Sequence, residues 1–239
     1  MHDTFWFFAA WSLAGLINNI TGFGAAMVAI PLIANFIPLE IAVPASTPIV
    51  LTLNLQVAWK YRHHIRRAPL CHLLMGSLAG TVVGLWSYQA VNSEALKSGM
   101  GLFVAAYALY NLRAPQHSPC SLGPGWGIGA GFASTVLGAI FGFNGPPLAL
   151  YVSKTGWGQE ETKGLLGACF IVTGSIILAG QLLAGLHNSQ TITGYLTGCP
   201  GTLLGGALGL SLSRRISQNM YQKAVLLLLF ASGIYICFI

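Results

Sequence analysis

The sequence NNITGFGA, residues 18–25, interrupts an apolar run that extends over residues 5–35. A second apolar run, 123–153, is interrupted in the same way by GAIFGFNGPP, residues 138–147. Each run has 31 residues, and one continuous helix of that length would measure about 46 Å. Glycine and adjacent prolines disfavour such a helix. Each run is therefore predicted to form two half-helices joined by an irregular turn.

The chain as a whole carries very little charge. Its 239 residues include 11 Lys plus Arg and 5 Asp plus Glu, or 7%, whereas a soluble domain carries roughly 25%. Apolar residues make up 54%, which would expose large apolar patches in water, and disorder requires the opposite composition. Open strand edges do not occur in lipid. The chain is therefore predicted to be an all-α integral membrane protein, with the lipid bilayer as its main partner.

About eight hydrophobic segments account for nearly the whole sequence, and about 20 apolar residues are enough to cross a bilayer. No room is left for a soluble domain, so residues 1–239 are predicted to form a single transmembrane domain. The net charge of +6 resides in the connections, which indicates membrane orientation and not nucleic-acid binding. The segments are 5–35, 41–59, 69–88, 95–112, 123–153, 164–186, 190–212 and 219–239.

The two halves of the chain resemble each other at a nearly constant offset. A constant offset, together with the same order of segments, indicates an internal duplication. Repeat 1 is predicted to cover 1–113, a linker 114–122, and repeat 2 123–239. The matching stretches, at offsets of 120 or 121 residues, are Gly22-Phe23 with Gly142-Phe143, 79–84 with 200–205, and 52–54 with 173–175.

The positions of the eleven basic residues distinguish two topologies. If all eight segments crossed the membrane once, five basic residues would lie on one side and six on the other. If the two long segments return to their starting side, ten of the eleven lie inside, all except Lys97. The positive-inside rule favours this second topology. It places both termini outside the cytoplasm and inverts repeat 2 relative to repeat 1.

Inverted repeats with broken helices are typical of secondary transporters, whose substrate site lies near the membrane midplane. Alternatively, the breaks serve only helix packing, since glycine lets helices approach closely in lipid. A packing role is expected for the glycines that recur every four residues on one face, namely Gly76, Gly80 and Gly84, and Gly201, Gly205 and Gly209.

The candidate site follows from the two breaks. A broken helix leaves free N–H groups at its new N-terminus, and these groups bind anions with the help of the helix dipole. No Lys or Arg is predicted in the membrane core, so backbone N–H, amide and hydroxyl groups would bind a small anion that must also leave. The predicted substrate-binding residues are Asn18, Asn19, Thr21, Gly22, Gly24, Ser46, Thr47, Phe143, Asn144, Gly145 and Pro146.

Alternative roles stay open for several of these residues. The Asn and Thr side chains at the breaks are either ligands or helix-end caps. Ser46 and Thr47 lie between Pro44 and Pro48, so they either line the cavity or satisfy backbone groups that the prolines free. The basic run 60–67 is expected to be a cytoplasmic loop that fixes the topology.

Several of these stretches together resemble the TauE/SafE sulfite exporter family, also called the toluene sulfonate uptake permeases. They are GLINNITGFGAAMVAIP (15–31), 42–47 with the basic exit 60–67, the glycine-rich stretch 76–84, and GFNGPP (142–147). The resemblance covers nearly the whole chain. It implies about eight membrane segments in two halves, and the transport of sulfur-containing anions such as sulfite, sulfonates or sulfoacetate.

The leading hypothesis is thus a multi-pass secondary transporter of a small anion in the plasma (inner) membrane. The sequence has no P-loop, so transport would be coupled to a substrate gradient or to a coupling ion, a proton or sodium. No cofactor, metal or oligomeric state is predicted, and the protein is not expected to be an enzyme. One alternative is a passive anion channel. The other is an intramembrane serine enzyme, which would have to use Ser77 or Ser175 with His72 or His187.

Overall fold

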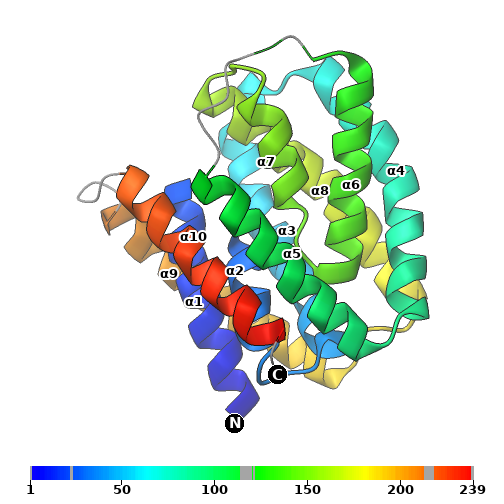
Figure 1. Cartoon of the computed structure of the whole chain (residues 1–239), viewed down its shortest axis with the longest axis vertical. Coiled ribbons are helices and arrows are strands. Elements are labelled where there is room, and N and C mark those ends of the chain that lie inside the picture. The colour runs from blue at the N-terminus through cyan, green and yellow to red at the C-terminus, as the bar shows by residue number, and fades with distance from the viewer. Residues whose placement is uncertain (1, 22–23, 114–119, 121, 213–217, 238–239) are drawn as a thin grey trace. The chain divides into compact units, whose positions relative to one another are not determined.

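The computed structural model describes residues 2–21, 24–113, 120, 122–212 and 218–237, and all the regular structure among them is helical (Figure 1). This confirms the all-α prediction. The elements are α1 (His2–Thr21), α2 (Ala25–Ile33), α3 (Leu39–Lys60), a 3₁₀ turn η1 (Arg62–His64), α4 (Arg67–Ala90), α5 (Ser93–Arg113), α6 (Pro124–Phe141), α7 (Gly145–Ser153), α8 (Gln159–Leu183), α9 (Ser189–Leu212) and α10 (Gln218–Cys237).

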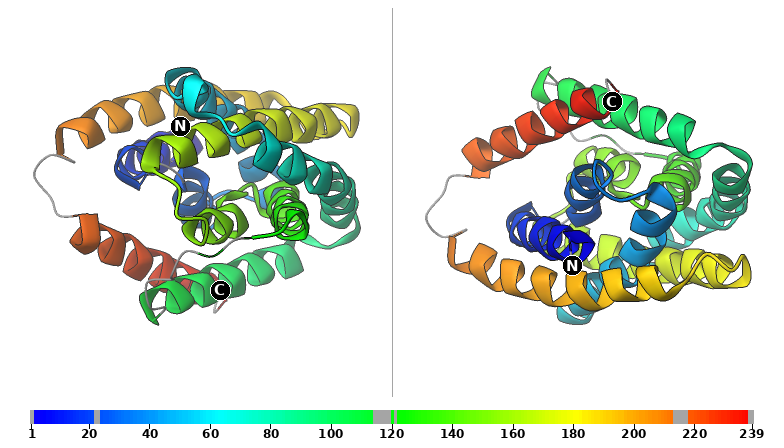
Figure 2. Two further views of the ribbon diagram at one scale, coloured as in Figure 1. Left: turned by 90° about the horizontal axis from the view of Figure 1, so that it is seen from above. Right: turned by 90° about the horizontal axis from the view of Figure 1, so that it is seen from below.

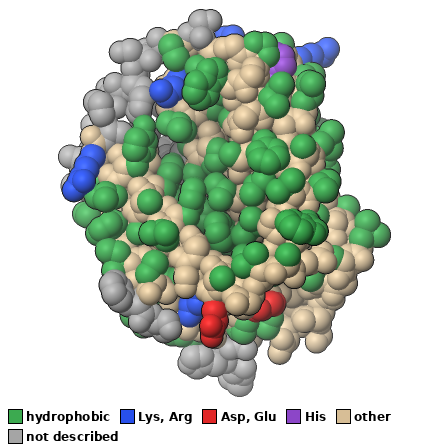
Figure 3. Space-filling view, turned by 45° about the vertical axis from the view of Figure 1, so that its right-hand side comes forward, with side chains coloured by type: hydrophobic (Ala, Val, Ile, Leu, Met, Phe, Trp, Pro, Cys, Tyr) green, Lys and Arg blue, Asp and Glu red, His purple; other side chains and the backbone are tan. Residues whose placement is uncertain are grey.

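Four helices among the described residues, α3, α4, α6 and α8, are long and apolar enough to cross a membrane. The outward face of α4 illustrates why such a helix belongs in lipid. Met75, Leu78, Val82 and Trp86 follow one another at helical spacing and are all exposed. Apolar side chains are likewise spread over the face shown in Figure 3, and the charged ones lie toward its margins. Exposed apolar side chains of this extent are stable only against lipid.

Both predicted helix breaks are confirmed. α1 ends at Thr21 and α2 begins at Ala25, and 120 residues later α6 ends at Phe141 and α7 begins at Gly145. We call α1–α2 hairpin one and α6–α7 hairpin two. Their arms are unequal, which the prediction of two half-helices did not anticipate: the first arms have 20 and 18 residues, and each second arm has 9. At about 1.5 Å per residue, the first arm of each hairpin is nearly long enough to cross the membrane. The second arm is about half that length.

The chain divides into two compact units that mix the two halves of the sequence. Unit 1 comprises 1–49, 91–114 and 186–239, and unit 2 comprises 50–90 and 115–185. Hairpin one therefore shares a unit with α9, and hairpin two shares a unit with α4. Each hairpin is packed against the glycine-rich helix from the other half of the sequence.

In unit 2, α4 and α6 lie side by side in direct backbone contact (Figures 1 and 2). A Cβ atom added to Gly76 would overlap the backbone of Ile128, and one added to Gly80 would overlap the backbone of Phe132. The Thr135 hydroxyl on α6 donates to the backbone carbonyl of Ser77 on α4 at 3.0 Å. Residues with higher numbers in α4 contact residues with higher numbers in α6. The two helices therefore run parallel.

In unit 1, α1 and α9 form the equivalent contact (Figure 2). A Cβ atom on Gly205 would overlap the backbone of Ser12, and one on Gly15 would overlap the backbone of Thr202. These two helices also run parallel, because Gly194 contacts Phe7 and positions further along α9 contact positions further along α1. The predicted packing role of the repeated glycines is thus confirmed at Gly76, Gly80, Gly84, Gly201 and Gly205; the surroundings of Gly209 lie outside the described residues.

Each hairpin ends next to the place where it begins. In unit 1, Phe36, shortly after α2, stacks on Trp6 of α1 with 3.8 Å between ring centroids and 5° between planes. In unit 2, the N–H of Cys120 donates to the carbonyl of Lys154 at 2.8 Å, which ties the chain entering α6 to the chain leaving α7. The second arm of each hairpin therefore returns toward the start of the first.

The direction of α8 agrees with the return of α7 toward the start of α6. Arg66, next to the start of α4, donates to Glu161 in the first turn of α8 at 2.6 and 3.0 Å. Near the other ends of the two helices, Gly180 lies against the Leu85 side chain. α8 therefore runs parallel to α4, and so to α6. Successive helices α6 and α8 have the same direction because α7 brings the chain back between them.

Candidate functional site

The break in hairpin one leaves the N-terminus of α2 buried. Its N-cap is Gly24, with φ 94°, and none of the side chains that the structure describes caps this end. Ala25, Ala26 and Met27 form the first turn and are all buried. The N–H groups of a first turn have no partner inside their own helix. A Cβ atom built on Gly24 meets no described atom within 4 Å, so the N-cap residue itself is not packed against a described neighbour.

The other predicted residues of this break lie at the end of α1. Asn18 is half-buried in the last turn of that helix. Asn19 and Thr21 belong to the same turn, but their side chains lie outside the described part of the chain, as does the whole of Gly22. The structure thus brings Asn18 and Gly24 to one helix break, and the roles of Asn19, Thr21 and Gly22 stay predictions.

Ser46 and Thr47 are buried within α3. The Ser46 hydroxyl donates to the carbonyl of Ala42 at 2.5 Å, and the Thr47 hydroxyl donates to Val43 at 3.3 Å. Prolines at 44 and 48 leave unpaired the carbonyls four residues earlier, those of Glu40 and Pro44. The two hydroxyls therefore bind carbonyls other than those that the prolines free.

The break in hairpin two is built from Gly142, Phe143 and Asn144. Gly142 has φ 76° and closes α6, its N–H donating to Gly138 at 3.0 Å. A side chain with a Cβ rarely adopts this φ. Phe143 is 1% exposed and its ring stacks against Phe141 with centroids 5.7 Å apart. This buried ring fixes the turn, so we assign Phe143 to the core of the hairpin.

Asn144 is the N-cap residue of α7, but its side chain caps no N–H of that helix. Its amide nitrogen lies 3.5 Å from the hydroxyl of Thr173 on α8, and its backbone carbonyl accepts a 2.6 Å hydrogen bond from Ser134 on α6. The alternative that Asn144 is a conventional side-chain cap is therefore wrong. The amide is held by its neighbours across the break and points to α8.

Gly145 and Pro146 begin α7 and are buried. Pro146 is followed by Pro147, and proline has no N–H. Two of the first three residues of α7 thus lack the donors that a helix N-terminus normally offers. Hairpin two therefore offers fewer backbone N–H donors at its break than hairpin one does.

Two further residues at this break, Ser134 and Thr173, were not predicted from the sequence. Each is 1% exposed, and each contacts Asn144. The Thr173 hydroxyl also donates to Cys169 within α8 at 2.8 Å. The internal repeat did mark Thr173, because it corresponds to Thr52 in the first half of the sequence. The repeat pattern did not indicate that α8 passes next to the break.

A separate polar cluster lies at the basic end of unit 2. His64 and Glu160 are 3.1 Å apart, and Arg66 binds Glu161 and lies over the Trp157 ring. The two glutamates belong to the first turn of α8, whereas the sequence indicated a loop. These are the ion pairs that the described residues form, and they neutralise part of the basic run 60–67.

The arrangement gives no support to the serine-enzyme alternative. The Ser77 hydroxyl donates to the carbonyl of Leu73 at 2.7 Å and packs at the α4–α6 contact. Ser175 is exposed on α8. His187 lies in the turn between α8 and α9, where burial lowers its pKa. The hydroxyl and imidazole groups thus have separate structural settings.

Two hairpins with broken helices, in a chain with long apolar helices, are features that many membrane transport proteins share. Comparison with known proteins agrees. The sequence profile of the family "Sulfite exporter TauE/SafE" matches residues 7–236, and the chain belongs to this family. It is also 27% identical over 172 residues to the "Probable inner membrane transporter protein TsaS" of Comamonas testosteroni, covering 71% of this chain and 72% of that one. No solved structure matches the chain.

Proposed function

We propose that this protein is a secondary transporter of a small, sulfur-containing anion of the sulfite, sulfonate or sulfoacetate class. The observation that carries the proposal is the buried N-terminus of α2, which no described side chain caps. A buried helix end without a partner is costly, and an anion supplies the partner that the N–H groups and the helix dipole favour. Membership of the sulfite exporter family supports the sulfur-containing class.

Each break would offer an anion a different set of groups. Hairpin one offers the N–H groups of Ala25, Ala26 and Met27, with Asn18, Asn19 and Thr21 as side-chain ligands. Hairpin two offers the amide of Asn144, supported by Ser134 and Thr173. All these groups are neutral, so they bind an anion weakly enough to release it.

We further propose that the halves 1–113 and 123–239 are inverted repeats joined by the linker 114–122. Support comes from the helix directions within each unit. In unit 2, α4, α6 and α8 all begin at the end where Arg66 and Lys154 lie. In unit 1, α1 runs parallel to α9, which leads toward Arg214 and Arg215. If the basic ends are cytoplasmic, both chain termini lie outside the cytoplasm of the plasma membrane.

Transport of this kind would draw its energy from the gradient of the anion or of a coupling ion, either a proton or sodium. The test is counterflow in liposomes that contain the purified protein and radiolabelled sulfite. Saturable counterflow is expected, and Asn144→Ala and Thr21→Ala should each reduce it while the protein still inserts. Asn111→Ala and Thr193→Ala are matched controls, because their side chains bind helix carbonyls outside the breaks.

Two results would overturn the proposal. Single-channel currents in place of saturable counterflow would indicate a passive anion channel. Unchanged counterflow in both Asn144→Ala and Thr21→Ala would mean that the breaks serve only helix packing.

A further inference from the structure

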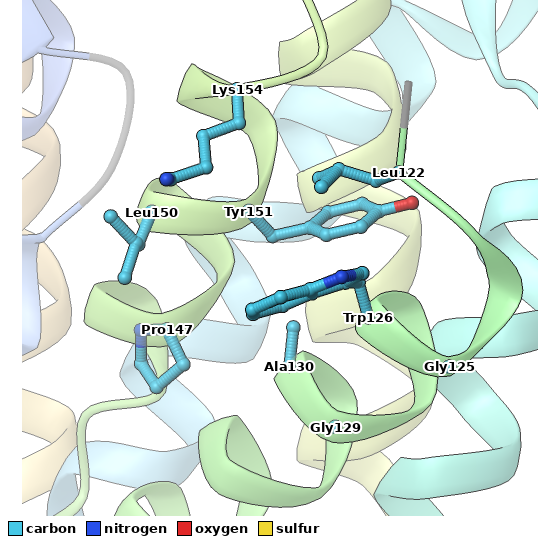
Figure 4. Close-up of a pocket in the computed structure, with 9 residues that line it drawn as sticks. All are labelled: Leu122, Gly125, Trp126, Gly129, Ala130, Pro147, Leu150, Tyr151 and Lys154. Atoms are coloured by element: carbon cyan, nitrogen blue, oxygen red, sulfur yellow. The ribbon is translucent and has the colours of Figure 1, made fainter. Parts of the chain in front are cut away.

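Hairpin two has a cavity at its open end, opposite the break. The cavity has a volume of about 470 Å³, within the range of roughly 300–1,000 Å³ typical of ligand sites. Figure 4 shows Pro147, Leu150 and Lys154 along α7 on one side, and Trp126 and Ala130 of α6 on the other, with the Tyr151 ring beside the Trp126 indole. Leu122, Gly125 and Gly129 complete the lining.

Glycines of α6 create this space. Gly125 and Gly129 lie on the opposite face of the helix from Gly131, which is packed against the backbone of Leu73. A Cβ atom on Gly125 or Gly129 would meet no described atom within 4 Å. Helix–helix packing explains Gly131 but not these two glycines, and their effect is to keep the cavity open.

The same position in hairpin one is closed by an aromatic side chain. Trp6 and Trp126 lie 120 residues apart in the first arms of the two hairpins. Trp6 is covered by Phe36, and the residue 120 positions after Phe36 is Gly156. Trp126 consequently remains 67% exposed. In hairpin one the Phe36 ring thus takes the space beside Trp6 that stays open beside Trp126.

The lining has the chemistry of a membrane-interface site. α6 is apolar enough to cross the membrane, and Trp126 lies in its first turn, the level at which Trp and Tyr anchor to lipid headgroups. Lys154 directly follows α7 and is the one charged residue of the lining. Neither of the ion pairs formed by the described residues involves it. The cavity thus combines an apolar body with one free cation at its end.

We propose that this cavity binds one anionic phospholipid, with an acyl chain against Gly129, Ala130 and Pro147 and the phosphate at Lys154. A long apolar surface and a single cation complement an acyl chain with a charged headgroup. A small hydrophilic anion would gain one polar partner and bury no apolar area. Basic pockets between membrane helices bind acidic headgroups for the same reason. The site is independent of the proposed transport site at the breaks.

The test uses fluorescence of the full chain in vesicles in which one lipid carries brominated acyl chains, because bromine quenches a tryptophan that it contacts. The Trp126 signal is the difference between the wild type and Trp126→Phe, since the chain has six tryptophans. Brominated phosphatidylglycerol should quench it at a lower mole fraction than brominated phosphatidylcholine, by about fivefold, because one Lys near a lipid surface contributes about 1 kcal/mol.

Two variants separate the headgroup contact from the acyl-chain contact. Lys154→Gln should remove the preference for phosphatidylglycerol, whereas Lys60→Gln, on a basic residue outside the cavity, should keep it. Gly129→Leu should fill the cavity and reduce quenching by both lipids without disturbing helix packing. Equal quenching by the two lipids in the wild type, or a preference that survives Lys154→Gln, would overturn the proposal and indicate ordinary boundary lipid.

Discussion

Hairpins one and two share a backbone plan but present different chemistry at their breaks. In hairpin one the second arm begins with Ala25, Ala26 and Met27, three buried residues that all have an N–H. In hairpin two it begins with Gly145, Pro146 and Pro147, of which only the glycine has one. Hairpin two compensates with the Asn144 amide and its hydroxyl neighbours. A repeated scaffold can thus offer backbone donors at one break and side-chain donors at the other.

The open ends of the hairpins differ as well. Phe36 closes hairpin one over Trp6, whereas hairpin two leaves Trp126 beside a cavity with Lys154 at its end. Duplicated elements are free to diverge wherever packing does not constrain them. Close glycine contacts with the neighbouring long helix occur in both hairpins, and close packing of this kind limits divergence.

The largest loss of stability should come from substitutions at the glycine contacts between the long helices. Gly15→Ala in hairpin one and Gly131→Ala in hairpin two each force a Cβ atom into the backbone of the neighbouring helix. Overpacking costs about 1–3 kcal/mol or more, so both variants should lose several degrees of Tm in detergent. Gly129→Ala is the matched control, because its Cβ points into open space, and it should keep the Tm. A difference between Gly15→Ala and Gly131→Ala would break the equivalence of the two packing faces.

The next effect concerns the donors at the breaks. Ala26→Pro removes one N–H from the first turn of α2, where proline is tolerated, and copies Pro146 of hairpin two. The loss of one hydrogen bond to a charged group, about 1.5–3 kcal/mol, should weaken sulfite binding at least tenfold. Titration of the purified protein with sulfite measures it.

The reverse exchange, Pro146→Ala, adds an N–H to α7 and should strengthen sulfite binding. Equal affinity in Ala26→Pro, Pro146→Ala and the wild type would show that the first-turn N–H groups do not contact the anion.

The smallest effect is expected at the open ends. Phe36→Ala removes the ring stacked on Trp6, and such a pair contributes about 0.5–1.5 kcal/mol beyond its buried area. Leu150→Ala in hairpin two should cost less, because a leucine that lines an open cavity loses fewer contacts than a stacked aromatic ring. Thermal unfolding of the two variants in the same detergent provides the comparison. A larger loss in Leu150→Ala would mean that hairpin two is closed by contacts beyond those described.

Much of this fold could be predicted from the sequence, since glycine or proline inside an apolar run disfavours a continuous helix and a membrane span needs an apolar run. Asn144 and Gly24 were predicted to lie at the breaks for the same local reason, and the structure places them there. Ser134 and Thr173 were missed because they reach Asn144 only through tertiary packing of α6 and α8. The pairing of α1 with α9 was also missed, since a glycine face indicates close approach without identifying the neighbour. Tyr151 and Lys154 form no motif and meet Trp126 only in the folded hairpin.

In the proposed inverted topology, the two hairpins return to opposite sides of the membrane. Glu40 and Glu160 lie 120 residues apart, in the first turns of the helices that follow hairpins one and two, and both are exposed. In a background without the native cysteines, Glu40→Cys and Glu160→Cys can be labelled in intact cells with a membrane-impermeant thiol reagent. Position 40 should be labelled from outside, and position 160 should be labelled only after the cells are opened. Labelling of both positions from the same side would contradict this topology.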